Sequence, residues 1–340
     1  MGSFMSTNSF PVKGRTILIT GGSRGTGLEA GRQLASKGAN VVIVARDQKR
    51  LQEGIEYIST GAASPETQRF HQISADMTGA ETCASVMAEV TEWNHGSPPD
   101  IVWCCAGSSQ PTMFIETEVS QFQALMELNY LSSAYMAHAA LRAWLRPATE
   151  AATPSGKGNT QSKALVARHL IFTSSFLALY PVAGYSPYSP SKAALRSLSD
   201  SLSQEMQLYA AANPNSPPVR VHTVFPATIY TESYEAENRI KSDLTKMLEE
   251  ADGGQTAEVV ARKSIEGLES GHELITCDLM TRFVMCSTLG ASLRGGFWKG
   301  LTDYFLGWLG LIVMILVRGY MDRKVRNWGK RYGDSGMKTQ

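Results

Sequence analysis

Short apolar runs, most of them β-branched, alternate along the chain with longer segments in which apolar residues recur at helical spacing. The runs are predicted to be buried strands at 15–20, 40–46, 71–76, 100–107, 170–175, 219–225 and 273–277. The longer segments predict helices at 28–37, 81–93, 119–145, 193–209 and 258–268. This alternation predicts an α/β fold, with one Rossmann-type, doubly wound parallel sheet in a single domain.

The domain is expected to cover residues 14–280, after an N-terminal tail at 1–13 and before a hydrophobic and basic region at 281–340. Residues 147–163 are rich in Ala, Thr, Gly, Ser and Pro, which predicts a surface insertion. Residues 227–250 are polar and charged and show no clear period at first. They are expected to form a mobile cover over the functional site.

A glycine-rich segment, Gly21-Gly22-Ser23-Arg24-Gly25-Thr26-Gly27, lies directly between the first strand and the first helix. In this position backbone N–H groups and the positive helix N-terminus face a pyrophosphate, and glycine lets the backbone approach it closely. The segment therefore predicts a dinucleotide site. Its candidate cofactor-binding residues are Gly21, Ser23, Arg24, Gly25 and Gly27.

The end of the second strand bears on the choice of cofactor. An acidic residue there would bind the adenosine ribose and repel a 2′-phosphate, but the chain has Arg46, with Arg50 one helical turn later. Guanidinium groups suit phosphate, so NADPH is favoured over NADH, although Asp47 is a signal in the other direction. Asp76, after the third strand, is a candidate acceptor for the adenine amino group or an N-cap of the next helix.

A tyrosine and a lysine four positions apart, Tyr188 and Lys192, share one face if they lie in a helix. A neighbouring ammonium is expected to lower the pKa of the phenol and make it a usable general acid and base. Ser175 is a candidate hydrogen-bond donor to the oxygen of a carbonyl under reduction, with Ser174 as the alternative. Taken alone, the tyrosine–lysine pair is also typical of an ordinary surface helix.

Three further residues are candidates. Asn129 interrupts the apolar face of the helix at 119–145, so its amide needs a partner, either structural or a water that relays protons to Lys192. Thr228 and Thr231, in the predicted cover, are candidates to contact the nicotinamide amide.

Composition excludes several other classes of protein. A net charge of +1 argues against a nucleic-acid partner bound through its phosphates. The five cysteines have no metal-ligand spacing, so no metal site is predicted, and their odd number fits a reducing compartment. The 43% content of hydrophobic residues is ample for a large core.

Together these motifs resemble the short-chain dehydrogenase/reductase family over residues 14 to 280. The resemblance rests on Thr20-Gly21-x-x-x-Gly25-x-Gly27, Cys105-Ala106-Gly107, Asn129, Ser175 and Tyr188-x-x-x-Lys192, in this order. It implies hydride transfer from nicotinamide C4, Tyr188 as proton donor, Lys192 on the nicotinamide ribose, Ser175 as oxyanion donor and Asn129 in a proton relay. It also implies a homo-oligomer formed through the helices that contain Asn129 and Lys192.

Two positions depart from the family pattern, with Cys105 in place of Asn and Ala227 in place of Gly after Pro226. These departures, with the Gly21-x-Ser23-x-Gly25 form of the loop and the hydrophobic C-terminal region, resemble the 3-ketodihydrosphingosine reductases within the family, especially those of fungi. That resemblance implies NADPH-dependent reduction of 3-oxosphinganine, a long-chain sphingoid ketone, to sphinganine in sphingolipid synthesis. The alternatives are a membrane-associated reductase of a steroid, retinoid or 3-ketoacyl group and a non-catalytic NADPH sensor.

The most hydrophobic stretch runs from Tyr304 to Val317, and seven basic and two acidic residues follow it, a local excess of five positive charges. This pattern predicts association with an anionic cytosolic leaflet, either across the bilayer or in one leaflet, and the alternative is a buried C-terminal helix or a dimer contact. With the resemblance it implies the endoplasmic reticulum membrane, with the catalytic domain facing the cytosol. The N-terminal Met-Gly-x-x-x-Ser pattern also permits myristoylation of Gly2.

Overall fold

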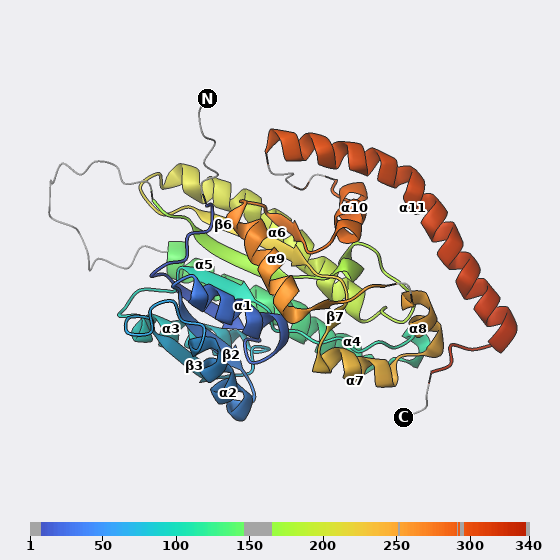
Figure 1. Cartoon of the computed structure of the whole chain (residues 1–340), viewed down its shortest axis with the longest axis horizontal. Coiled ribbons are helices and arrows are strands. Elements are labelled where there is room, and N and C mark those ends of the chain that lie inside the picture. The colour runs from blue at the N-terminus through green and yellow to red at the C-terminus, as the bar shows by residue number, and fades with distance from the viewer. Residues whose placement is uncertain (1–7, 146–164, 251, 291, 293–295, 338–340) are drawn as a thin grey trace.

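A computed structural model describes residues 8–145, 165–250, 252–290, 292 and 296–337. Within them a sheet of seven parallel strands has the order β3-β2-β1-β4-β5-β6-β9 (Figure 1). The strands are β1 Thr16–Thr20, β2 Asn40–Ala45, β3 Phe70–Ser74, β4 Ile101–Cys104, β5 Arg168–Thr173, β6 Val219–Phe225 and β9 Leu274–Thr276. The prediction of a Rossmann-type parallel sheet is confirmed.

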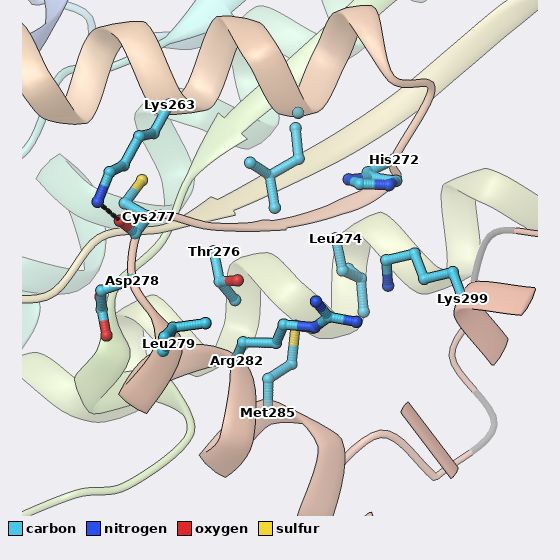
Figure 2. A pocket seen from close by; sticks show the side chains of 12 residues that line it. Lys263, His272, Leu274, Thr276, Cys277, Asp278, Leu279, Arg282, Met285 and Lys299 are labelled. Carbon is cyan, nitrogen blue, oxygen red and sulfur yellow. Dashed lines mark hydrogen bonds between the residues drawn. The ribbon is translucent and has the colours of Figure 1, made fainter. Parts of the chain in front are cut away.

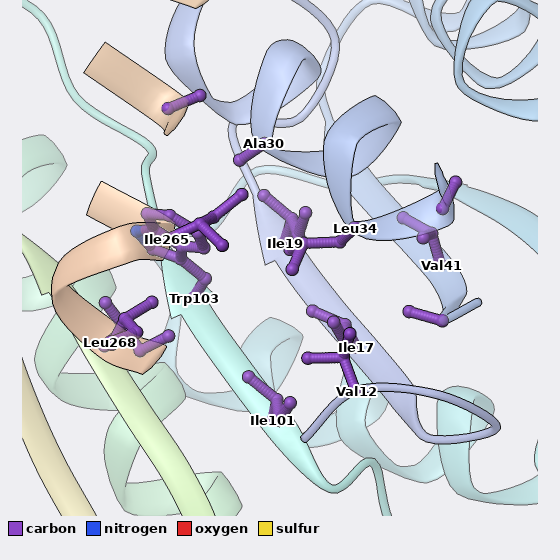
Figure 3. Close-up of a cluster of buried hydrophobic side chains, with 14 of the residues drawn as sticks. Val12, Ile17, Ile19, Ala30, Leu34, Val41, Ile101, Trp103, Ile265 and Leu268 are labelled. Atoms are coloured by element: carbon purple, nitrogen blue, oxygen red, sulfur yellow. The ribbon is translucent and has the colours of Figure 1, made fainter. Parts of the chain in front are cut away.

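Helices cover both faces of the sheet because the side chains of each central strand alternate between two cores. Ile17 and Ile19 of β1 belong to a core with α1 (Gly25–Ser36), α2 (Gln48–Ser59) and α9 (Ala257–Glu269), shown in Figure 3. Leu18, between them, belongs to the core under α3 (Ala80–Trp93), α5 (Ser132–Leu145) and α6 (Tyr188–Ala212). Trp103 of β4 is fully buried in the first core. Both faces of the sheet are therefore apolar, which explains the continuous apolar runs in the sequence.

The helix expected at 119–145 is interrupted. It consists of α4 (Val119–Met126), a π-helical turn η2 (Glu127–Leu131) and α5. A π turn adds a residue to the helical turn and is found most often at functional sites. Here it contains Asn129, which is fully buried.

Residues 227–250, expected as a cover without clear period, contain regular elements. A short strand β7 (Ile229–Tyr230) pairs with β8 (Gln255–Thr256), and α7 (Glu232–Ile240) and α8 (Asp243–Glu249) follow β7. Thr231 caps α7 and Ser242 caps α8, each by accepting a hydrogen bond from the backbone N–H three positions on. Two short 3₁₀ turns, η1 (Phe114–Glu116) and η3 (Phe176–Ala178), lie in the loops after β4 and β5.

The C-terminal region contains α10 (Leu279–Ser287) and the 36-residue helix α11 (Phe297–Tyr332), which runs past α10 along the outside of the molecule to α8 (Figure 1). Its buried residues are small or polar: Asp303, Gly307 and Gly310, which share one face. Its large apolar side chains are exposed, among them Trp308, Ile315 and Leu316. By length and composition it is apolar enough to cross a membrane. The alternative of a helix buried within the domain is wrong, and the alternative of a dimer contact stays a prediction.

Some predictions concern the ends and insertions of the domain. Phe10 and Val12, within the predicted N-terminal tail, are buried in the core beside α9. The predicted insertion at 147–163 and Gly2 lie outside the described residues. The domain boundaries at residues 14 and 280 stay predictions.

Candidate active site

The candidate residues follow the carboxyl ends of strands at the centre of the sheet. The order of strands reverses between β1 and β4, and crevices at such a point bind ligands in open α/β sheets. The glycine segment follows β1, residues 105–107 follow β4, and Ser174 and Ser175 follow β5. Parallel pairing of these strands brings the three segments to one edge.

The glycine segment is packed so closely that side chains would not fit. A Cβ on Gly21 would lie 2.7 Å from the backbone nitrogen of Ala106, and one on Gly27 would lie 2.6 Å from the carbonyl oxygen of Gly21. Gly21 and Gly25 also have φ values of +68° and +57°, in the left-handed region. The N-cap residue of α1, Arg24, makes no side-chain capping hydrogen bond. The segment thus fits the pyrophosphate of a dinucleotide, which the N–H groups at the start of α1 would hold.

Arg46, Arg50 and Asp76 gather at the neighbouring strand ends. Arg46 and Asp76 are exposed, with Nη1 of the arginine 4.0 Å from Oδ2 of the aspartate. Arg50, in the first turn of α2, forms a salt bridge to Glu232 of α7. Ser23 contacts the same helix, because its Cα lies 3.5 Å from the position of a Cβ on Gly54.

Both acidic residues at these strand ends have local hydrogen-bond partners. Asp47 is the N-cap of α2, where its carboxylate accepts from the backbone N–H of Arg50 at 3.0 Å. Asp76 accepts from the backbone N–H and the hydroxyl of Thr78, and these bonds hold the pKa of its carboxyl below the usual value. The alternative that Asp76 caps α3 is wrong, because Gly79 occupies the N-cap position.

Tyr188 is the first residue of α6, and Lys192 lies one turn later on the same face. Nζ of Lys192 is 5.9 Å from the centre of the Tyr188 ring and donates to the carbonyl oxygen of Thr173 at 2.9 Å. Lys192 is only 5% exposed, and this burial lowers the pKa of its ammonium to about 8. The group is therefore a buried cation at neutral pH, next to the phenol.

The expectation that Lys192 lowers the pKa of Tyr188 is not met here. Burial raises the pKa of the phenol above its usual value of 10.0, since a buried phenolate loses its hydration. A hydrogen-bonding interaction with the Ser175 hydroxyl opposes this shift, and the nearby carboxylate of Glu237 adds to it. Tyr188 is thus a protonated donor at neutral pH.

The two serines after β5 differ in their surroundings. The Ser174 hydroxyl is 2% exposed and donates to the carbonyl oxygen of Lys192 at 2.8 Å, so it holds α6 against β5. The Ser175 side chain interacts with Tyr188 and accepts from the backbone N–H of Leu177 at 3.2 Å. The surroundings favour Ser175 as the residue that faces a carbonyl.

Asn129 joins three segments of the site. Its Oδ1 accepts from the backbone N–H of Ser108 at 2.9 Å, and its Nδ2 donates to the Ser108 carbonyl and to the Ser191 hydroxyl, each at 3.0 Å. A Cβ on Gly107 would lie 2.8 Å from Oδ1 of Asn129 and 3.1 Å from Nζ of Lys192. Glycine at this position therefore lets the amide and the ammonium approach the same strand end.

The cover reaches the glycine segment. The methyl carbon Cγ2 of Thr231 lies 3.7 Å from the position that a Cβ on Gly25 would take, and its hydroxyl caps α7. Thr228 lies one residue before β7, where its carbonyl accepts from the backbone N–H of Gln255. Of the two threonines, Thr231 is the one in contact with the glycine segment.

A separate cavity of about 500 Å³ lies beside the edge strand β9, between α9 and α10 (Figure 2). Lys263, His272, Arg282 and Lys299 contribute to its walls. None of Ser175, Tyr188 and Lys192 lines it, so it is distinct from the site at β1 and β4. Among the described residues no cluster of three or more His, Cys, Asp or Glu side chains could hold a metal ion.

Sequence reasoning missed three residues of this site: Thr173, Ser191 and Glu237. The Thr173 carbonyl accepts from Lys192, and its hydroxyl accepts from the Trp103 indole and donates to the Cys105 sulfur. Ser191 was identifiable by its place between Tyr188 and Lys192. The signal for Glu237 was the helical spacing of Tyr234, Glu237 and Lys241 inside the predicted cover.

Comparison with known proteins agrees with this geometry. The model of the short chain dehydrogenase family matches residues 15–241. A 3-ketodihydrosphingosine reductase of Aspergillus fumigatus is 47% identical over 96% of this chain and 88% of its own, and one of Neurospora crassa is 40% identical over 98% and 87%.

Solved structures agree on the fold. A short-chain dehydrogenase/reductase from Mycobacterium ulcerans matches with a TM-score of 0.62 at 21% identity, covering 78% of this chain and 89% of its own. A dehydrogenase/reductase from Sinorhizobium meliloti matches with a TM-score of 0.60 at 23% identity, covering 80% and 97%. The chain belongs to the short-chain dehydrogenase/reductase family, and it is a nicotinamide-dependent oxidoreductase.

Proposed function

We propose that this enzyme reduces the ketone of 3-ketodihydrosphingosine (3-oxosphinganine) to the alcohol of sphinganine, with NADPH as the reductant. The observation that carries the proposal is the 47% identity to a reductase of that name over 96% of the chain, a range that includes most of the C-terminal region. The arrangement of Ser175, Tyr188 and Lys192 supports the same reaction, since a cofactor sensor without turnover would not need all three.

The preference for NADPH is supported by the charges at the end of β2. Arg46 and Arg50 lie at the end of β2 and the start of α2, where a 2′-phosphate is expected, and Arg24 is exposed in the glycine segment. The acidic residue among them, Asp47, is engaged as the N-cap of α2. Asp76 is the proposed acceptor for the adenine amino group, and Thr231 the proposed contact of the nicotinamide amide.

The proposed roles of the other residues follow from their protonation states. When bound, NADPH supplies a hydride to the carbonyl carbon. Tyr188, protonated at neutral pH, donates its proton to the carbonyl oxygen, while the Ser175 hydroxyl stabilises the charge that develops on that oxygen. Lys192 binds the nicotinamide ribose, and Asn129 belongs to the relay that returns the proton.

Membrane association is supported by α11. Its outer face carries exposed Tyr304, Trp308, Ile315 and Leu316, and its last turns are basic. We propose that this helix holds the enzyme at the endoplasmic reticulum membrane, with the catalytic domain in the cytosol. A substrate with a long acyl chain then reaches the enzyme from lipid. We also propose a homo-oligomer that forms through the helical segment α4-η2-α5, which contains Asn129, and through α6, which contains Lys192.

The test is NADPH oxidation by the full-length protein in detergent, with 3-ketosphinganine, a steroid ketone, a retinal and a 3-ketoacyl thioester as substrates. We expect turnover confined to 3-ketosphinganine. Tyr188→Phe is the matched control, because it removes the proton donor with little change in shape and should abolish turnover but retain NADPH binding. Activity on another ketone alone would reject the sphingoid substrate, and NADPH binding without turnover of any ketone would favour a sensor.

A further inference from the structure

The inner face of α7 lies against the tyrosines of the site. Tyr234 and Glu237 of α7 are three residues apart and share this face, and Lys241, four residues after Glu237, is the C-cap residue of the helix. Nζ of Lys241 is 4.8 Å from the centre of the Tyr234 ring and 5.7 Å from that of Tyr185. The Tyr185 ring is in turn 6.0 Å from that of Tyr188. Glu237 is thus held on the side of the cover that faces the proton donor.

The ammonium nearest to Glu237 has another partner. Nζ of Lys241 donates to the Glu249 carboxylate at 2.7 Å, and the lysine side chain is only 1% exposed. Two carboxylates therefore share one buried cation, and the ion pair that Lys241 forms is with Glu249. Glu237 is left with a negative charge that a second cation would balance.

The surroundings of Glu237 show where that cation would lie. Its charge raises the pKa of Tyr188, and the Ser109 hydroxyl lowers the pKa of Glu237 itself, so the carboxyl lies near both. Ser109 belongs to the loop after β4, next to Ser108, which bonds to Asn129. Glu237 therefore lies within electrostatic reach of the phenol, on a helix whose neighbouring Lys241 is 5.7 Å from the Tyr185 ring.

The substrate of the proposed function carries a cation close to the ketone that is reduced. In 3-ketodihydrosphingosine an ammonium group is bonded to the carbon next to the carbonyl carbon. When the carbonyl oxygen meets Tyr188, this ammonium lies beside the phenol. Steroid ketones, retinal and 3-ketoacyl thioesters have no cation there.

We propose that Glu237 binds the ammonium group of the substrate and makes the enzyme selective for 2-amino ketones. This inference rests on the proposed function. Glu237 acts as a specificity-determining residue and takes no part in the proton transfer, which belongs to Tyr188. Burial raises the pKa of Glu237 to about 6, so its carboxylate is charged at neutral pH, when it can pair with an ammonium. The cover then closes over the head of the substrate with the two charges paired.

The test compares 3-ketosphinganine with its 2-deamino analogue, 1-hydroxy-3-octadecanone, at pH 7.5 in detergent, on full-length wild-type protein and Glu237→Gln. Glutamine keeps the size of the side chain and removes its charge. We expect kcat/KM for the amino ketone to fall roughly 10- to 100-fold, mainly through KM, as for the loss of a charged hydrogen bond. The loss on the deamino ketone should be at least about tenfold smaller. Glu235→Gln, exposed on the same helix, is the matched control.

Equal losses on the two ketones would overturn the proposal, because they would show that Glu237 only supports the fold of the cover. An unchanged KM for the amino ketone in Glu237→Gln would overturn it as well. In both cases the wild-type enzyme still reduces 3-ketosphinganine, and the proposed function stands. Wild-type protein that reduces the deamino ketone but not 3-ketosphinganine would reject the proposed function and this inference together.

Discussion

Arg50 on α2 and Glu232 on α7 form a salt bridge between the cofactor side of the site and its cover, with Nη1 2.9 Å from Oε2. The two residues are 182 positions apart in the sequence. The same guanidinium is a proposed ligand of the 2′-phosphate of NADPH. Glu232 and the phosphate thus compete for Arg50, so binding of NADPH would release this attachment of α7.

Glu232→Gln should therefore lower the KM for NADPH by about twofold to fivefold, the effect of an exposed ion pair, and leave the KM for NADH unchanged. Steady-state kinetics with both cofactors measures this. Glu235→Gln removes the same charge from the same helix without touching Arg50 and should have no effect. A KM for NADPH that rises in Glu232→Gln would show that the salt bridge assists cofactor binding.

Arg46→Glu should raise the KM for NADPH by more than tenfold and that for NADH much less, because the new carboxylate repels only the 2′-phosphate. Lys49→Glu changes the same charge on an exposed residue in the first turn of α2 and provides the control. If the KM values for both cofactors rise equally, Arg46 does not bind the 2′-phosphate.

Ser175→Ala should lower kcat by about 100- to 1,000-fold, as for removal of one oxyanion donor. Ser174→Ala should retain most of the activity but lose about 1 kcal/mol of unfolding free energy, because its hydroxyl donates to the Lys192 carbonyl. Comparing kcat and urea unfolding of the two variants shows which serine takes part in catalysis and which one stabilises the fold. The reverse pattern would assign the oxyanion role to Ser174.

Lys192→Met should abolish activity and stabilise the fold. Burial lowers the pKa of Lys192 from 10.5 to about 8, so the unfolded chain binds more protons between these values and wild-type stability rises with pH there. Below pH 8 the buried charge of Lys192 lowers the free energy of unfolding of the wild type by about 3 kcal/mol. The variant avoids this loss but gives up about 1 kcal/mol from the hydrogen bond to Thr173. The variant should be about 2 kcal/mol more stable in urea at pH 7, and the difference should shrink towards pH 10. A variant less stable than wild type at both pH values would contradict this account.

The double variant Ile315→Lys/Leu316→Lys should lose binding to zwitterionic phosphatidylcholine liposomes in a flotation assay, because both side chains are exposed on α11 and charge is unfavourable in lipid. Its melting temperature should stay close to that of the wild type, since neither side chain is packed against the domain. Leu208→Lys, an exposed apolar position on α6, is the control and should retain binding. Full binding by the double variant would place the membrane contact elsewhere.

The sheet could be predicted because strands such as Val41–Val44, buried on both faces, need continuous apolar runs. Tyr188 and Lys192 could be predicted from their helical spacing. The environment of Asn129 could not, because the hydrogen bonds of its amide go to Ser108 and Ser191, which are distant in sequence. The raised pKa of Tyr188 could not be predicted either, because it is caused by burial in the folded protein and not by the neighbouring lysine.

Helix α11 is attached to the domain at both ends, through the glycines that pack on α10 and through Ser335, whose hydroxyl donates to Glu116 and whose carbonyl accepts from Leu244 of α8. A lipid layer that holds this helix would therefore also fix how the cover and the site are oriented towards it. In the proposed orientation the enzyme takes its ketone from the bilayer. The reaction rate then depends on the mole fraction of substrate in the lipid. Adding inert lipid at constant total substrate would then slow the reaction, while adding buffer would leave it unchanged.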